Sequence, residues 1–129
     1  MRDLLIDPGI VIYGQSANDH AGDGLATGDL NADGIADLAI AATSAPQPNG
    51  SGRTFVVFGR QSWPDSLDLA VDTNVMIRGR DPGYYLGYPP EIADLTGDGR
   101  DDLLVSAHLG DGPGNARFNA GEVYLLAGR

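Results

Sequence analysis

Two acidic ten-residue segments carry the clearest chemistry in this chain. Residues 29–38 read DLNADGIADL, and residues 94–103 read DLTGDGRDDL. In both, oxygen-bearing side chains occupy positions 1, 3, 5 and 9, and a glycine at position 6 permits a sharp turn. Carboxylate, amide, hydroxyl and backbone carbonyl oxygens suit a hard cation. The spacing therefore predicts two calcium ions per chain, one in each loop.

The predicted ligands of the first loop are the side chains of Asp29, Asn31, Asp33 and Asp37 and the carbonyl of Ile35; those of the second are the side chains of Asp94, Thr96, Asp98 and Asp102 and the carbonyl of Arg100. The Asn31 amide is a better oxygen donor than the Thr96 hydroxyl, so we expect tighter binding in the first loop. Asp101 is expected to face solvent. Magnesium fits less well, because it requires tight octahedral geometry and keeps several waters.

Position 12 separates these loops from EF-hands. An EF-hand has a bidentate glutamate there, whereas this chain has Ile40 and Val105. The residues after position 9, LAIA at 38–41 and LLVS at 103–106, are typical of buried strands rather than of a helix leaving the loop. We therefore expect calcium loops between strands.

More than the loops is duplicated. The first loop starts at Asp29 and the second at Asp94, 65 residues later. Residues 54–60 (TFVVFGR) correspond to residues 123–129 (VYLLAGR) at an offset of 69, so the second copy has about four extra residues within 110–119. Other positions match at the offset of 65: Ile12 with Ile77, Gly14 with Gly79, Gly22 with Gly87, and Ala39 with Leu104.

Short apolar runs between turn residues predict an all-β fold, and four strands per repeat are typical of a β-propeller blade of antiparallel strands. The predicted strands are 10–13, 25–29, 37–42, 54–58, 75–78, 92–94, 102–107 and 122–127. The predicted organisation is a leader with the outer strand of a preceding blade (1–14), a first blade (15–78) and a second blade without its outer strand (79–129).

The run GLATGDLNADGIADLAIAA at 24–42 closely resembles the FG-GAP repeats of the integrin α-subunit propeller and of many bacterial secreted proteins. The resemblance covers everything after about Gly9 and looks like two repeats of a bacterial-type array. Its FG element is Leu86-Gly87, degraded to Ala21-Gly22 in the first copy. The resemblance implies a propeller of roughly seven blades, calcium at the loop between the first and second strands, and an extracellular or cell-surface location.

Composition excludes several function classes. Eighteen acidic and eight basic residues give a net charge of −10, which opposes binding to nucleic acid and to anionic membranes. The chain has no cysteine and therefore neither a disulfide nor a thiolate metal site. We also expect no signal peptide at the N-terminus and no membrane insertion.

Little in the sequence predicts catalysis. His20 and His108 have no local Ser or Asp arrangement typical of a triad, so they are interpreted as turn residues and the protein as a non-enzyme. Aromatic residues could stack on sugars or pack between blades. Packing is favoured for the tyrosines, and the two alternatives stay open for the tryptophan: Tyr84, Tyr85, Tyr88 and Trp63.

The function predicted from these observations is a calcium-binding, non-catalytic adhesion or protein-interaction module outside the cell, with a protein or glycan ligand. The alternatives are a lectin-like propeller and an accessory propeller of a secreted hydrolase. Two blades alone are expected to leave two apolar faces open. We therefore expect neighbouring blades from the same chain or from a homo-oligomeric ring, in which strand 10–13 would complete the next subunit's last blade.

Overall fold

The computed structural model describes residues 4, 9–46 and 49–128 of the chain. The described residues form short strands and one 3-10 turn, in the order β1 (Val11–Tyr13), β2 (Ala21–Gly28), β3 (Asp37–Ala42), β4 (Arg53–Val57), β5 (Ser66–Asp68), β6 (Val75–Arg78), β7 (Glu91–Ala93), β8 (Asp102–Ala107), η1 (Pro113–Asn115) and β9 (Glu122–Leu126). This confirms the all-β fold class. Within the described residues, no helix has the length and apolar character needed to cross a membrane.

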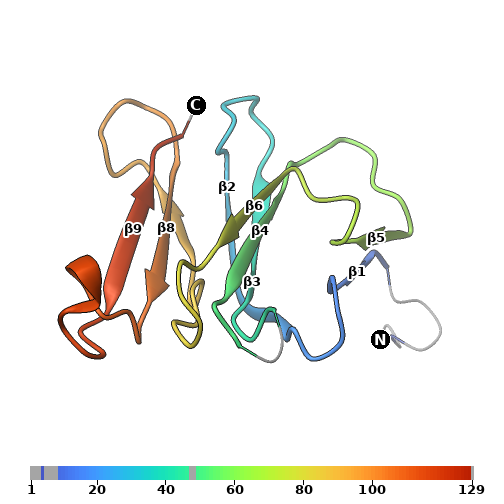
Figure 1. Cartoon of the computed structure of the whole chain (residues 1–129). Helices are drawn as coiled ribbons and strands as arrows, with labels where there is room; N and C mark the ends of the chain where they lie inside the picture. The colour runs from blue at the N-terminus through green and yellow to red at the C-terminus, as the bar shows by residue number, and fades with distance from the viewer. Residues whose placement is uncertain (1–3, 5–8, 47–48, 129) are drawn as a thin grey trace.

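Two antiparallel sheets correspond to the two sequence repeats. The first blade has the strand order β2-β3-β4-β6, and the second blade has the order β7-β8-β9. Figure 1 shows the blades side by side, with both acidic loops at the upper end. The predicted bounds of β3, β6 and β8 match the structure. Strands β4 and β7 each lie one residue earlier than predicted, and β9 ends one residue earlier.

Strand β2 starts four residues earlier than predicted. Its pairing with β3 shifts between Ala21 and Gly24, where Gly22 has a φ of 102°. A β-bulge of this kind inserts an unpaired residue and breaks the alternation of side chains. The sequence pattern therefore showed only the regular part of the strand.

Strand 10–13, predicted as the outer strand of a preceding blade, has a pairing partner within this chain that was not predicted. Its residues Val11–Tyr13 form β1, which pairs in parallel with β5, so that Ile12 lies opposite Leu67. Strand β5 was not predicted, because three residues are too few to show a period. The sequence holds one local signal, the alternation of Ser66 and Asp68 with Leu67 and Leu69. In the structure the two leucines are buried and the two polar residues are exposed.

Both faces of the first blade pack against apolar residues of other segments. On one face, Ala39 and Val56 pack against the second blade through Leu103, Val105 and other residues. The opposite face was expected to be open. Instead, a second core cluster packs Phe55 against the β1–β5 pair and its flanks; it comprises Ile40, Ala42, Ala45, Phe55, Val57, Leu67 and Leu69, with Ile12, Leu38, Trp63 and Met76 at its margin.

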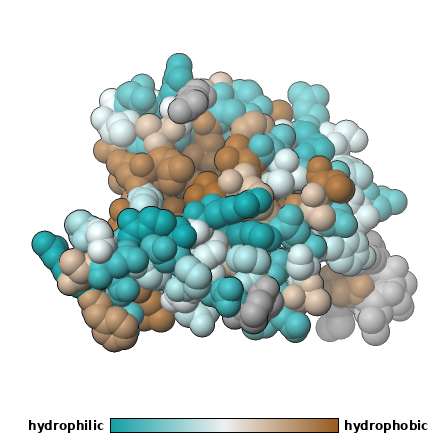
Figure 2. Space-filling model, in the orientation of Figure 1, coloured by the Kyte–Doolittle hydropathy of each residue, from teal (hydrophilic) through white to brown (hydrophobic). Residues whose placement is uncertain are grey.

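The outward face of the second blade is exposed, as expected. Val123 is 66% exposed and Leu125 is 49% exposed, whereas Tyr124 between them packs toward the first blade. Figure 2 shows apolar atoms on the upper part of this blade. Strand β9 also ends the sheet, so its outer edge has no neighbouring strand among the described residues.

The duplication extends to the backbone. Residues with positive φ recur 65 positions apart in Asn18 and Gly83, His20 and Tyr85, Gly22 and Gly87, Ala32 and Gly97, and Gly34 and Gly99; they recur 69 positions apart in Gly50 and Asn119, and in Gly52 and Gly121. Both offsets agree with the sequence repeat. The two copies therefore share turn conformations even where their side chains differ.

Candidate metal centres

The first acidic loop joins β2 to β3 and is folded by its own side chains. The two carboxylate oxygens of Asp29 accept hydrogen bonds from the backbone N–H groups of Asp33 (3.0 Å) and Gly34 (2.8 Å). Asp33 Oδ1 accepts from the N–H of Ile35 at 2.8 Å. The Asn31 amide accepts from the Asp33 N–H and donates to Asp33 Oδ2, both at 3.0 Å. The predicted ligands at positions 1, 3 and 5 therefore lie together in one turn.

The second loop, between β7 and β8, repeats this arrangement. Asp94 accepts from the N–H groups of Gly97 (2.7 Å), Asp98 (3.2 Å) and Gly99 (2.9 Å). Asp98 Oδ1 accepts from the N–H of Arg100 at 3.0 Å. In both loops, therefore, the backbone N–H groups of positions 5 and 6 donate to the carboxylate of position 1. The N–H group of position 7 donates to the carboxylate of position 5.

The position-9 carboxylates are fully buried and bond on both oxygens. Asp37 accepts from the N–H of Leu30 at 2.9 Å and from the N–H of Gly59 at 2.8 Å. These bonds join the first loop to the chain that leaves β4. Because a buried N–H without a partner is costly, Asp37 has a structural role in addition to its predicted role as a ligand.

Asp102 makes the equivalent contacts in the second blade. It accepts from the N–H groups of Leu95 and Thr96, both at 2.8 Å, and from the N–H of Gly128 at 3.0 Å. The hydrogen bond from Gly128 is the main cause of a lowered pKa for the Asp102 carboxyl; bonds from Thr96 and Leu95 add to it, and burial opposes it. Hydrogen bonds to the charged form favour the ionised carboxylate.

The donor chemistry of the loops fits calcium. All the predicted side-chain ligands are oxygens. A carboxylate oxygen that accepts one N–H, as each oxygen of Asp29 does, keeps a second lone pair for a cation. In Asp94 only Oδ2 does so, because Oδ1 accepts two N–H groups. Asp33 and Asp98 are exposed, so an ion could reach them. However, no three acidic, histidine or cysteine side chains among the described residues form a group that could hold a metal ion. All ten predicted ligands, including the carbonyls of Ile35 and Arg100 and the Thr96 hydroxyl, therefore stay predictions.

Asp101 does not face solvent as predicted. It is only partly exposed, and its Oδ2 accepts from the backbone N–H of Asp29 at 2.8 Å. This bond joins position 8 of the second loop to position 1 of the first, across the blade interface. A Cβ atom at Gly28 would lie 2.7 Å from the same oxygen, so the approach depends on glycine there. The available signal was a difference between repeats, because the first copy has Ala36 at this position.

The aromatic residues divide between packing and exposure. Tyr84 is 4% exposed and belongs to the core between the blades, which confirms the packing interpretation for this residue. Trp63 lies at the margin of the other core cluster, with the guanidinium carbon of Arg60 5.1 Å from its ring centroid. Tyr85 and Tyr88 are 37% and 53% exposed, contrary to that interpretation.

The histidines lie at the end of the sheets opposite the acidic loops. His20 Nδ1 and Ser44 Oγ are 3.1 Å apart and form an exposed hydrogen bond between two turns. His108 stacks on Tyr85, with 6.0 Å between ring centroids. Sequence reasoning did not identify either contact, since each joins residues at least 23 positions apart.

Comparison with known proteins identifies the duplicated unit. The FG-GAP repeat family matches residues 21–57 and 91–126. The chain is 33% identical to rat phosphatidylinositol-glycan-specific phospholipase D over 109 residues, covering 83% of this chain and 12% of the relative. It is 33% identical to Drosophila melanogaster integrin alpha-PS2 over 118 residues, covering 86% of this chain and 7% of the relative. The human phospholipase D of the same name is 28% identical over 109 residues, again 12% of its length. The chain thus spans about a tenth of the length of these relatives.

Proposed function

Because this chain belongs to the FG-GAP repeat family, we propose that it is a calcium-binding pair of propeller blades that acts as a non-catalytic adhesion or protein-interaction module outside the cell. The observation that carries the calcium proposal is the shared fold of the two acidic loops. Both place oxygens of positions 1 and 5 around the same turn, at the same end of adjacent blades. One loop could be an acidic surface turn, but two with the same internal bonds favour a common ligand.

The ions would be held by Asp29, Asn31 and Asp33 in the first loop, and by Asp94, Thr96 and Asp98 in the second. Calcium would supply positive charge that offsets clustered carboxylates in a chain with a net charge of −10. It would therefore stabilise the turns between the first and second strands of each blade. Since these turns already have internal hydrogen bonds, the ion would reinforce an existing conformation.

Isothermal titration calorimetry tests this proposal. We expect two calcium ions per chain, with affinities in the micromolar to millimolar range, and loss of both in the double variant Asp33→Ala, Asp98→Ala. The matched control is Asp65→Ala, Glu91→Ala, which removes two exposed acids outside the loops. The proposal would be contradicted if the wild-type chain took up no more calcium than the loop variant.

Calcium bound only to the folded state should also raise stability. One site adds about 2.7 kcal/mol when free calcium is a hundredfold above its dissociation constant. The thermal unfolding midpoint should therefore rise with calcium and fall in excess chelator. Asp29→Ala should remove only the stabilisation that calcium in the first loop contributes.

The adhesion or interaction role rests on family membership. FG-GAP repeats are generally non-catalytic, and one matched relative is an integrin alpha chain. The match to a phospholipase D keeps a second candidate, an accessory propeller beside an enzyme. Both candidates are non-catalytic, and testing the isolated chain for phospholipase D activity checks this shared assignment, because measurable turnover would contradict it.

We propose that another blade covers the outward face of the second blade. Val123 and Leu125 are exposed on this face, and β9 has an unpaired edge. A neighbour could come from the same protein or from another copy of this chain; completion by β1 would require breaking its pairing with β5. In sedimentation velocity we expect the chain to form oligomers, and we expect Leu125→Arg to weaken this association. A well-folded, monodisperse monomer would contradict self-association of this chain.

A further inference from the structure

A hollow lies between the two blades at the end opposite the acidic loops. Its volume is about 370 Å³, and five residues line it: Asp23, Thr43, Tyr85, Tyr88 and His108. The six residues of β3 separate Thr43 from the first loop, a distance of about 20 Å at the usual rise of a strand. The volume falls in the range of about 300–1,000 Å³ that is usual for small-molecule sites.

Four of the five lining residues come from two repeat positions. Asp23 and Tyr88 are 65 residues apart, and so are Thr43 and His108. The first blade thus contributes a carboxylate and a hydroxyl, and the second contributes a phenol and an imidazole. The residues just before Asp23 and Tyr88, Gly22 and Gly87, both have a positive φ, so this shared turn does not itself account for the different side chains that follow it.

The aromatic side of the hollow is fixed by its neighbours. Tyr85 has a φ of 52° and stacks on His108 with an interplanar angle of 30°. Its ring also lies against Gly50, where a Cβ atom would come within 3.1 Å of Cε1. The carbonyl of Tyr88 accepts a hydrogen bond from Ser106 Oγ at 2.6 Å. Tyr88 is 53% exposed and Tyr85 is 37% exposed, so Tyr88 is the more open of the two residues.

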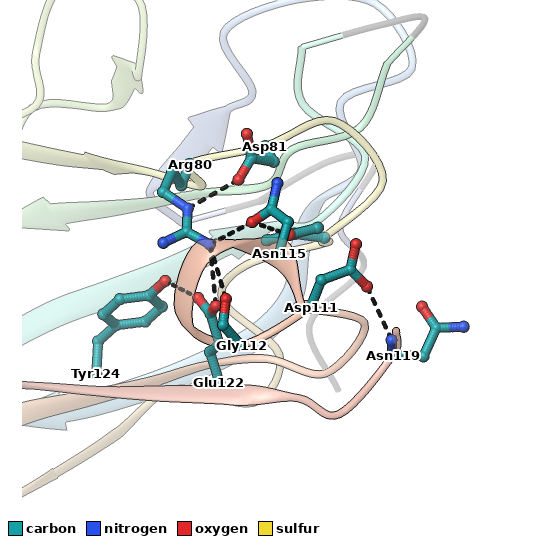
Figure 3. A network of polar contacts seen from close by, with 9 residues as sticks. Arg80, Asp81, Asp111, Gly112, Asn115, Asn119, Glu122 and Tyr124 are labelled. Atoms are coloured by element: carbon teal, nitrogen blue, oxygen red, sulfur yellow. Dashed lines mark hydrogen bonds and ion pairs between the residues drawn. The ribbon is translucent and has the colours of Figure 1, made fainter. Parts of the chain in front are cut away.

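A polar network holds the connection that carries these tyrosines. Figure 3 shows Arg80 bonded to Asp81 (2.8 Å), Asn115 (2.8 Å) and Glu122 (3.1 Å), so that the connection after β6 is joined to the second blade. Tyr84, next to Tyr85 in sequence, donates to Asn115 Oδ1 at 3.0 Å. Such supporting contacts keep binding side chains in place before a ligand arrives.

The polar side of the hollow accepts hydrogen bonds. Asp23 Oδ2 accepts from the Thr43 hydroxyl, which orients the carboxylate, and the Asp23 side chain is exposed. A ligand with several hydroxyl donors and an apolar C–H face would match a carboxylate beside an open phenol ring. We propose that this hollow binds a neutral sugar ring, such as the terminal residue of a glycan.

Other ligand classes fit less well. Asp23 and the net charge of −10 oppose phosphate and other anions. A cation site in an aromatic cage requires open ring faces around the charge, but His108 and Gly50 occupy the surroundings of Tyr85. A sugar needs only one open ring, which Tyr88 supplies. The inference gives a ligand class to the interaction role proposed above and does not depend on calcium.

Saturation-transfer NMR with free glucose, galactose, mannose and N-acetylglucosamine tests the proposal on the whole chain. At least one sugar should bind, and Tyr88→Ala and Asp23→Asn should each weaken its binding by roughly tenfold, as expected for loss of a contact to a charged or stacking group. Tyr13→Ala is the control, because Tyr13 is 56% exposed on β1 and lies outside the hollow. Amide spectra of each variant report whether it remains folded.

Three results would overturn the proposal. They are the absence of binding to all four sugars, equal sugar binding by the wild type and a folded Tyr88→Ala variant, and binding of tetramethylammonium in place of the sugars. The variant Asp33→Ala, Asp98→Ala separates this inference from the calcium proposal. It should lose calcium and keep the sugar, whereas the Tyr88 variant should lose the sugar and keep calcium.

Discussion

Replacing Asp37 by asparagine separates the structural role of this carboxylate from its predicted role in binding calcium. The side chain is fully buried, and its oxygens accept from the N–H groups of Leu30 and Gly59. Asparagine has the same shape but only one acceptor oxygen. In Asp37→Asn, one of the two backbone donors must therefore face an amide NH₂ group.

The cost follows from these two bonds. A hydrogen bond to a charged acceptor contributes about 1.5–3 kcal/mol, and a buried donor without a partner costs about 1–3 kcal/mol. One bond persists in a weaker, neutral form, so we expect Asp37→Asn to lower the free energy of unfolding by about 2–4 kcal/mol. That is a large part of the roughly 5–15 kcal/mol typical of folded domains.

Urea unfolding at pH 7 in excess chelator measures this effect without calcium. Asp33→Asn is the matched control, because its remaining oxygen can still accept from Ile35 and the side chain is exposed; it should cost less than about 1 kcal/mol. If Asp37→Asn unfolds like the wild type in chelator and differs only when calcium is present, the structural role assigned to Asp37 is wrong.

Four further substitutions test other contacts. Ala32 has a φ of 58° where the second loop has Gly97, so Ala32→Gly should stabilise the chain by about 1 kcal/mol and Gly97→Ala should destabilise it similarly; urea midpoints in chelator measure both. Removing the bond across the blades with Asp101→Ala should cost about 1 kcal/mol in the same assay, and an unchanged midpoint would show that the bond contributes nothing. The lowered pKa of Asp102 means that its stabilising effect is present above about pH 4 and is lost as the pH falls through the folded-state value. The urea midpoint should therefore fall on acidification, less so in Asp102→Asn, and equal pH profiles would contradict the assignment.

The parts of this fold that the sequence predicted are those with local signals. Strands β3 and β8 are continuous apolar runs directly after an acidic loop, and their bounds match the structure. The loops were recognisable because ligand residue types and a turn glycine stand at fixed spacings. The duplication of the loops indicated, independently of the strand pattern, where each blade lies in the sequence.

The parts that the sequence did not predict depend on contacts between distant segments. Strand β5 exists because β1 pairs with it from more than fifty residues away. Asp101 was assigned to solvent, since nothing near it in sequence shows that the Asp29 N–H lies opposite. Tyr85 and Tyr88 were expected to pack between blades, because sequence alone does not say which ring faces the core.

The two ends of the blades differ in how the repeat is used. At the acidic end, both copies repeat residue types as well as conformation, so that Asp29 and Asp94 make the same backbone bonds. At the other end only the conformation is repeated: His20 and Tyr85 share a positive φ but have different environments. A turn that needs a particular side chain to fold restricts that position in every blade, whereas a turn folded by its backbone leaves the position free. This difference favours stabilisation of the blades at the acidic end and ligand recognition at the opposite end.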